Sequence, residues 1–158
     1  MLRTLLMATL MVASIPLGAT TVPNEPTRTL DLARYAGQWH EIAHLPMFFQ
    51  RQCVDNITAT YIVRPDGMLG VHNACRTQDG SMQVSDGEAK TVPGQPAGAL
   101  KVRFAPAWLS WLPWVWADYW VIEVDADYQW AVVGSPSRKY LWILSRQPQM
   151  NPQLLQNL

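Results

Sequence analysis

From residue 37 onward the chain consists of short runs in which apolar and polar side chains alternate. In LKVRF, residues 100–104, two charged side chains fall on one face and three apolar side chains on the other. Residues 57–63 show a similar row, with threonines on the opposite face. Alternation of this kind is typical of β-strands with one buried face. We predict strands at residues 37–45, 56–63, 68–75, 81–92, 98–105, 118–125, 129–134 and 139–146.

The segments between these runs carry turn-forming residues, as in RPDG at residues 64–67 and GSPS at residues 134–137. They are too short for crossover helices, so the sheet is expected to be antiparallel. The predicted fold is all-β, an eight-stranded antiparallel up-and-down barrel whose closure removes exposed edges. The last run, residues 140–144, is apolar on both faces, and we expect something to cover its outer side. Asn151 and Pro152 begin a helix of about two turns.

The N-terminal segment has the pattern of a secretory signal peptide. Residues 1–19 carry Arg3 followed by the apolar run LLMATLMVASIPLGA. A retained anchor is the alternative, although the run is short for a span of ~20 apolar residues. Cleavage after Ala19 leaves residues 20–158 as a single domain. Thr20 stands where bacterial lipid attachment requires Cys, so we expect an exported, periplasmic product.

Charge and cysteine content narrow the partners and the chemistry. Twelve Lys and Arg balance twelve Asp and Glu, which gives no global attraction to nucleic acid. In an exported protein Cys53 and Cys75 are candidates for a disulfide that stabilises by ~3 kcal/mol. Two separate buried thiols are the alternative. A hairpin tip at residues 65–67 places Cys75 opposite Ile57, so a bridge requires the chain before Asp55 to leave the strand and bend back.

Three motifs follow one another along the chain: GQW at residues 37–39, VDADYQWAVV at residues 124–133 and LWILSR at residues 141–146. Together they resemble the lipocalin family, in its bacterial, apolipoprotein-D-like group, over residues 31–148. The resemblance implies a calyx with a closed end and an open mouth, and similar cysteine pairs occur in relatives. The implied structural residues are Gly37, Trp39, Asp127, Tyr128 and Arg146, with Arg146 packed over Trp39 at the closed end.

The chain departs from the family pattern in three places. Ala126 stands where the family usually has Thr, which puts one turn hydrogen bond in question. The family's C-terminal helix is longer, so we expect that this chain, ending at Leu158, is a truncated form. The lipid-attachment Cys that many members carry is absent.

Residues 40–44, HEIAH, also spell the zinc-protease signature H-E-x-x-H. In a helix the two histidines are ~6 Å apart along the axis and can share one ion. In a strand they are ~13 Å apart and cannot. Pro46 ends any helix soon after His44. We therefore predict no metal site and no cofactor, and ask instead whether Glu41, in alternation with Trp39, points into the barrel.

A tryptophan-rich segment joins the fifth and sixth predicted strands at the expected open mouth. Three interpretations remain open: the indoles fold back as a lid, they stay exposed and insert into a bilayer interface, or they form a homodimer contact. The residues concerned are Trp108, Trp111, Trp114 and Trp116.

Alternation and the inward phase of the family predict the side chains that line the interior. Small residues beside large ones indicate a cavity rather than a filled core. The predicted lining is Ala59, Tyr61, Gly70, His72, Leu100, Val102, Phe104, Ala131, Val133, Tyr140, Trp142 and Leu144.

These features predict an exported lipocalin that binds and stores or transports an amphipathic lipid, such as a fatty acid or a lysophospholipid. Its mouth loop would contact a membrane, such as the outer membrane surface. No catalytic chemistry is expected. One alternative is a lipid-modifying enzyme on the same barrel, which requires a free thiol or a buried Glu41 or Glu123 beside His72. Another is a membrane-surface interaction protein with a filled barrel.

Overall fold

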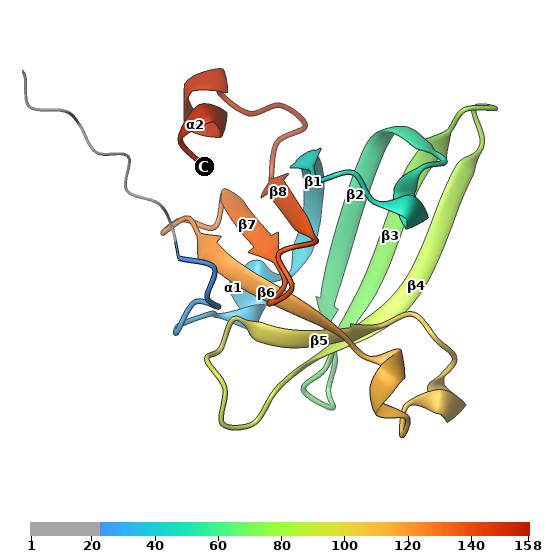
Figure 1. Cartoon of the computed structure of the whole chain (residues 1–158), viewed down its shortest axis with the longest axis vertical. Helices are drawn as coiled ribbons and strands as arrows, with labels where there is room; N and C mark the ends of the chain where they lie inside the picture. Colours follow the sequence, from blue (N-terminus) through green and yellow to red (C-terminus); the bar gives the residue numbers. More distant parts are fainter. Residues whose placement is uncertain (1–22) are drawn as a thin grey trace, which may run out of the picture.

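The computed structural model describes residues 23–158, and the predicted signal peptide at residues 1–19 lies outside the described residues. Each of the eight strands pairs with its sequence neighbour, and β8 pairs with β1, so the antiparallel barrel is closed as predicted (Figure 1). The strands are β1 (Gly37–His44), β2 (Cys53–Val63), β3 (Leu69–Thr77), β4 (Met82–Thr91), β5 (Ala99–Arg103), β6 (Ala117–Val124), β7 (Trp130–Gly134) and β8 (Leu141–Ser145).

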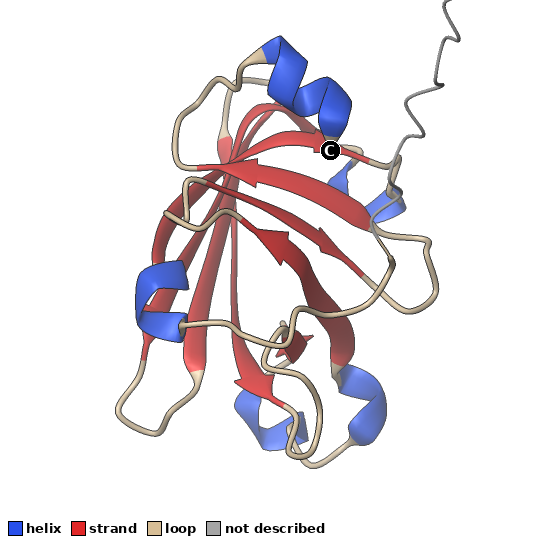
Figure 2. Cartoon of the chain, turned by 90° about the vertical axis from the view of Figure 1, so that its left-hand side faces the viewer, coloured by secondary structure: helices blue, strands red, loops and turns tan. Residues whose placement is uncertain are grey.

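Helical segments lie at the periphery of the barrel (Figure 2). The short helix α1 (Leu32–Tyr35) precedes β1, and the Asp31 side chain caps it by accepting hydrogen bonds from two backbone N–H groups. The predicted C-terminal helix is present as α2 (Pro152–Asn157), with Asn151 as its N-cap. Neither helix has the length and apolar character that crossing a membrane would require.

The closed end of the barrel, which we call the base, is built around Trp39. This side chain has no exposed surface, and its indole N–H donates to the Tyr35 carbonyl at 2.8 Å. The Arg146 guanidinium lies 3.7 Å from the indole ring centroid, which confirms the predicted stacking. Arg146 also donates to five backbone carbonyls at 2.7 to 3.3 Å, those of Arg34, Tyr35, Ala36, Gln38 and Tyr128.

Gly37 is required at the base for two reasons. Its φ of +95° lies in a region that L side chains rarely adopt. A Cβ at this position would also lie 3.2 Å from the Arg146 guanidinium. Glycine at the first motif position therefore gives the arginine room to approach the start of β1.

The turn between β6 and β7 is held by the Asp125 side chain, because Ala126 cannot supply a side-chain hydrogen bond. The Asp125 carboxylate accepts from the backbone N–H groups of Asp127 and Gln129 at 3.2 and 3.1 Å. Tyr128 adopts a φ of +57°, and its hydroxyl accepts from the Asp31 N–H at 2.9 Å. The turn is thus joined directly to the cap of α1.

The outer face of the last strand carries a buried side chain, as the apolar run at residues 140–144 predicted. Val132 on β7 and Ile143 on β8 are register partners and point away from the interior. Their exposed fractions are only 7 and 8%. The centre of the outer face of β8 is therefore shielded from water.

Candidate functional site

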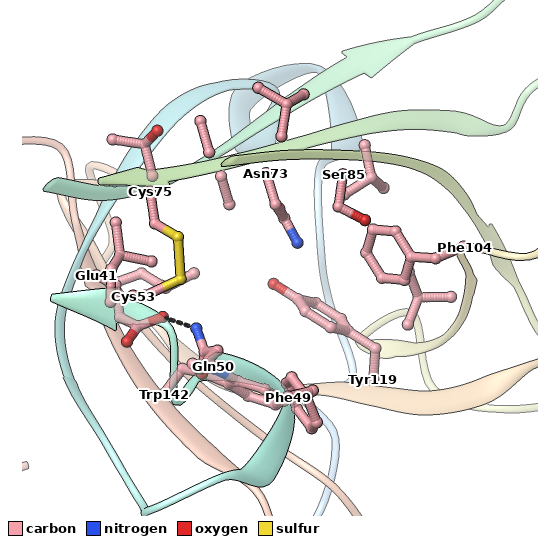
Figure 3. A pocket seen from close by; sticks show the side chains of 18 of the residues that line it. Glu41, Phe49, Gln50, Cys53, Asn73, Cys75, Ser85, Phe104, Tyr119 and Trp142 are labelled. Carbon is pink, nitrogen blue, oxygen red and sulfur yellow. Dashed lines mark hydrogen bonds between the residues drawn. A yellow bond between two sulfur atoms is a disulfide. The ribbon is translucent and has the colours of Figure 1, made fainter. Parts of the chain in front are cut away.

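A cavity of about 470 Å³ occupies the barrel above the base. Figure 3 shows it from close by, with side chains from several strands around an open centre. Seven of the predicted lining residues lie in its wall: Ala59, Tyr61, Val102, Phe104, Tyr140, Trp142 and Leu144.

Three further residues of the predicted lining are interior but do not border the cavity. Leu100, Ala131 and Val133 are at most 1% exposed and pack in the core cluster that includes Tyr35 and Trp39. Their inward phase was predicted correctly. They fill the barrel interior beside the base, so they are packing residues rather than cavity wall.

The predicted phase of β3 was wrong by one residue. Gly70 and His72 lie on the outer face, where the half-exposed His72 ring pairs with Asp86 at 2.7 Å. Val71 and Asn73 border the cavity in their place. Cys75 offered a signal for the correct phase. If this cysteine is buried, alternation places residues 73 and 71 on the same inward face.

Cys53 and Cys75 form a disulfide in the cavity wall, with 5.6 Å between their Cα atoms. The sequence had suggested that the chain before Asp55 must leave the sheet for the bridge to form. The structure shows that it does not leave the sheet. Instead β2 begins at Cys53, and two register shifts on either side of Asp55 bring Cys53 opposite Thr77. Asn56, with a φ of +54°, lies within this irregular part. The irregular register brings Cys53 closer to Cys75 than a regular register would, so the two side chains can form the disulfide.

Glu41 faces the cavity, which answers the question left by the sequence. Its side chain is only 7% exposed and accepts from the Gln50 amide at 2.9 Å. The imidazole of His44 contacts the other carboxylate oxygen, which otherwise has no donor. Burial raises the pKa of Glu41, while the contacts with Gln50 and His44 oppose that shift. Figure 3 shows the carboxylate and Gln50 joined beside the disulfide.

A β-bulge explains how Glu41 and His44 reach each other. On a regular strand, residues three apart point to opposite faces. Between β1 and β8 the register shifts from Glu41 opposite Leu144 to Ala43 opposite Ile143, so β1 contains one extra residue. The extra residue places His44 on the same face of the strand as Glu41.

Aromatic rings form much of one wall. Trp142 stacks on Tyr140 and on Tyr119, with ring centroids 6.0 and 6.4 Å apart. Phe49, from the loop between β1 and β2, lies 5.8 Å from the ring centroid of Tyr140. Tyr119, Phe49 and Gln50 were not among the predicted lining residues, although alternation from Ala117 along β6 indicates that Tyr119 points inward.

The tryptophan-rich loop between β5 and β6 exposes three of its four indoles. Trp108, Trp111 and Trp114 are 73, 76 and 76% exposed, so they do not fold back as a lid. Trp116 was wrongly assigned to the contact surface. It is 9% exposed, and its ring packs under Lys90 and Arg103 at 3.9 and 5.2 Å. This residue fixes the loop to the outer wall.

HEIAH lies in the strand β1, as predicted, and not in a helix. In the part of the chain that the structure describes, no three His, Cys, Asp or Glu side chains gather so as to hold a metal ion. The motif contributes Glu41 to the cavity wall, and His44 contacts the Glu41 carboxylate.

A closed barrel with a plugged base and an open, largely apolar cavity defines the class of barrels that bind small hydrophobic molecules. Residues 30–158 match the family model described as a lipocalin-like domain, and the chain belongs to the lipocalin family. Members of this family are generally binding and transport proteins.

Curated relatives agree with this assignment. Temperature-induced lipocalin-1 of Arabidopsis thaliana is 41% identical over 136 residues, which cover 85% of this chain and 72% of the plant protein. Outer membrane lipoprotein Blc of Escherichia coli is 38% identical over 144 residues, covering 90% of this chain and 74% of Blc. Insecticyanin of Manduca sexta shares the fold, with a TM-score of 0.63 at 22% identity, covering 86% of this chain and 74% of insecticyanin.

Proposed function

We propose that this lipocalin binds an amphipathic lipid, a fatty acid or a lysophospholipid, in its cavity and stores or transports it. The observation that carries the proposal is the open cavity of about 470 Å³ with a wall formed largely by apolar and aromatic side chains. Each CH₂ group that leaves water contributes ~0.8 kcal/mol, so burial of an acyl chain favours binding. The relatives' membership of a family of binding proteins supports the same conclusion.

The charged residues of the wall favour one orientation of the lipid. No Lys or Arg is present among the described residues that border the cavity. The Glu41 carboxyl is buried in the wall, whereas the Asp118 carboxylate is paired with Lys101 at 2.8 Å. A lipid carboxylate or phosphate inside the barrel would lose its hydration without gaining a cation. We infer that the anionic head stays at the mouth and the chain points to the base.

Native mass spectrometry of the protein incubated with hexadecanoic acid and lysophosphatidylethanolamine tests this proposal. We expect one bound lipid per chain. An Ala59→Phe variant, which fills part of the cavity, should show a reduced adduct while circular dichroism confirms its fold. Absence of any adduct on the wild-type protein would contradict the carrier function, and unchanged binding by the variant would place the lipid outside the barrel.

We further propose that the lipid is loaded at a membrane surface through the tryptophan-rich loop. Trp108, Trp111 and Trp114 are the observation in favour, since indoles partition to bilayer interfaces. A triple Trp→Ser variant should lose cosedimentation with phosphatidylglycerol and phosphatidylethanolamine vesicles. Trp130→Ser, beside a base turn, is the matched control. If the triple variant instead dissociates a dimer in analytical ultracentrifugation and sediments with vesicles as before, the loop is a homodimer contact.

We propose export, with association at the outer membrane, as the name of the Blc relative supports. The mass of the mature chain from fractionated cells tests this, with cleavage after Ala19 expected.

The proposal assigns no reaction to the barrel. Cys53 and Cys75 are paired in a disulfide, and His72 lies on the outer face. Among the described residues, these two observations support the proposal over the enzyme alternative, which required a free thiol or a carboxyl beside a buried His72.

A further inference from the structure

Three tyrosine hydroxyls form a chain where the cavity meets the base. The Tyr119 hydroxyl lies 2.8 Å from that of Tyr35 and 2.7 Å from that of Tyr61. Tyr61 and Tyr119 border the cavity, whereas Tyr35 is fully buried in the core. Burial raises the pKa of Tyr61 to about 12, so the phenol keeps its proton at neutral pH.

The number of protons exceeds the number of hydrogen bonds in this chain. Three hydroxyls carry three protons, and the two short contacts use two of them. One O–H is left to donate elsewhere. If it were on Tyr35, it would be buried without an acceptor, which costs free energy. Tyr35 therefore donates to Tyr119, and the spare proton belongs to Tyr119 or to Tyr61. Both of these residues face the cavity.

Asn73 offers a second polar group from another wall. Its carbonyl oxygen Oδ1 is buried away from the cavity surface and has no hydrogen-bond donor among the described residues. Figure 3 shows the Asn73 amide nitrogen and the Tyr119 hydroxyl directed toward the same open centre. The cavity thus presents two donors to a ligand, the Asn73 N–H and the spare tyrosine O–H, from a largely apolar wall.

We propose that the cavity floor binds a hydroxyl group carried at the buried end of the lipid chain. A hydroxyl is both a donor and an acceptor, so it can accept from the spare tyrosine O–H or the Asn73 N–H and donate to a tyrosine oxygen. A carboxylate does not fit, because the Glu41 carboxyl borders the same cavity and no Lys or Arg among the described lining residues would offset a second negative charge. This inference rests on the proposed carrier function and specifies its ligand class as hydroxylated acyl chains.

The test compares hexadecanoic acid with 16-hydroxyhexadecanoic acid, whose hydroxyl reaches deepest when the carboxylate stays at the mouth. The measured quantity is the ratio of their Kd values, by titration calorimetry. The combined Tyr35→Phe, Tyr61→Phe and Tyr119→Phe variant removes every hydroxyl of the chain and leaves no orphaned partner. We expect the preference for the hydroxylated lipid to fall by about three- to tenfold in this variant, the range of one hydrogen bond.

Tyr35→Phe alone is the matched control. It leaves two hydroxyls and one hydrogen bond, so one proton still faces the cavity and the wild-type preference should persist. An equal Kd ratio in the wild-type and triple variants would overturn the hydroxyl subsite while leaving the carrier function intact. Failure of both lipids to bind the wild-type protein would instead overturn the carrier function. Thermal melting of each variant checks that it is folded.

Discussion

The base and the mouth of this barrel use the same residue type in opposite ways. At the base, Trp39 has no exposed surface and its N–H has a partner. At the mouth, Trp108 and Trp111 are about three-quarters exposed. A buried indole whose N–H has a hydrogen-bond acceptor contributes to the stability of the fold. An indole exposed to water is available to contact a partner. The contrast predicts that Trp39 contributes more to the stability of the fold than the exposed tryptophans of the mouth.

Substitution of one tryptophan at each end tests this division most strongly. Trp39→Ala removes a fully buried ring and should lower the free energy of unfolding by about 3–5 kcal/mol, enough to unfold a marginal domain. Trp111→Ala should change it by less than about 0.5 kcal/mol. Urea denaturation followed by circular dichroism measures both. Equal losses at the two positions would show that the mouth loop is also part of the core.

The disulfide restrains the strands covalently near the mouth, whereas the base is held by the packing of Trp39 and Arg146. Replacing Cys53 and Cys75 together with Ala opens a link across a sequence separation of 22 residues. The free energy of unfolding should fall by about 3 kcal/mol on the chain-entropy model. Reduction of the wild-type protein should have a similar effect, and the double variant should not respond to reductant. A variant as stable as the wild-type protein would show that packing alone holds β2 and β3 at the mouth.

Glu41 should produce the smallest effect, one that depends on pH. Because burial raises its pKa above 4.5, the folded protein holds this proton to a higher pH than the unfolded chain does. Between those two pKa values the stability of the wild-type protein should therefore fall as pH rises. The same titration of Glu41→Gln should lack this fall, as measured by urea denaturation from about pH 4 to 7. A slope of opposite sign would mean that the His44 contact outweighs burial.

The sequence predicted contacts best where both partners belong to recognisable motifs. The packing of Arg146 over Trp39 was predicted because these residues belong to the third and first motifs of the family. The phase of β3 was predicted wrongly, since small residues such as Gly70 and Ala74 leave no clear apolar row. Trp116 could not be separated from Trp114, because its burial depends on Lys90 and Arg103 from other strands.

The bulge in β1 also determines which side chains a one-residue deletion would move. The extra residue lies between Glu41 and Ala43 in the register against β8. A β1 shorter by one residue here would be regular, with the same carboxylate and imidazole two positions apart and still on one face. The pairing of Glu41 with His44 therefore depends on which face the two side chains occupy and not on the exact length of the strand.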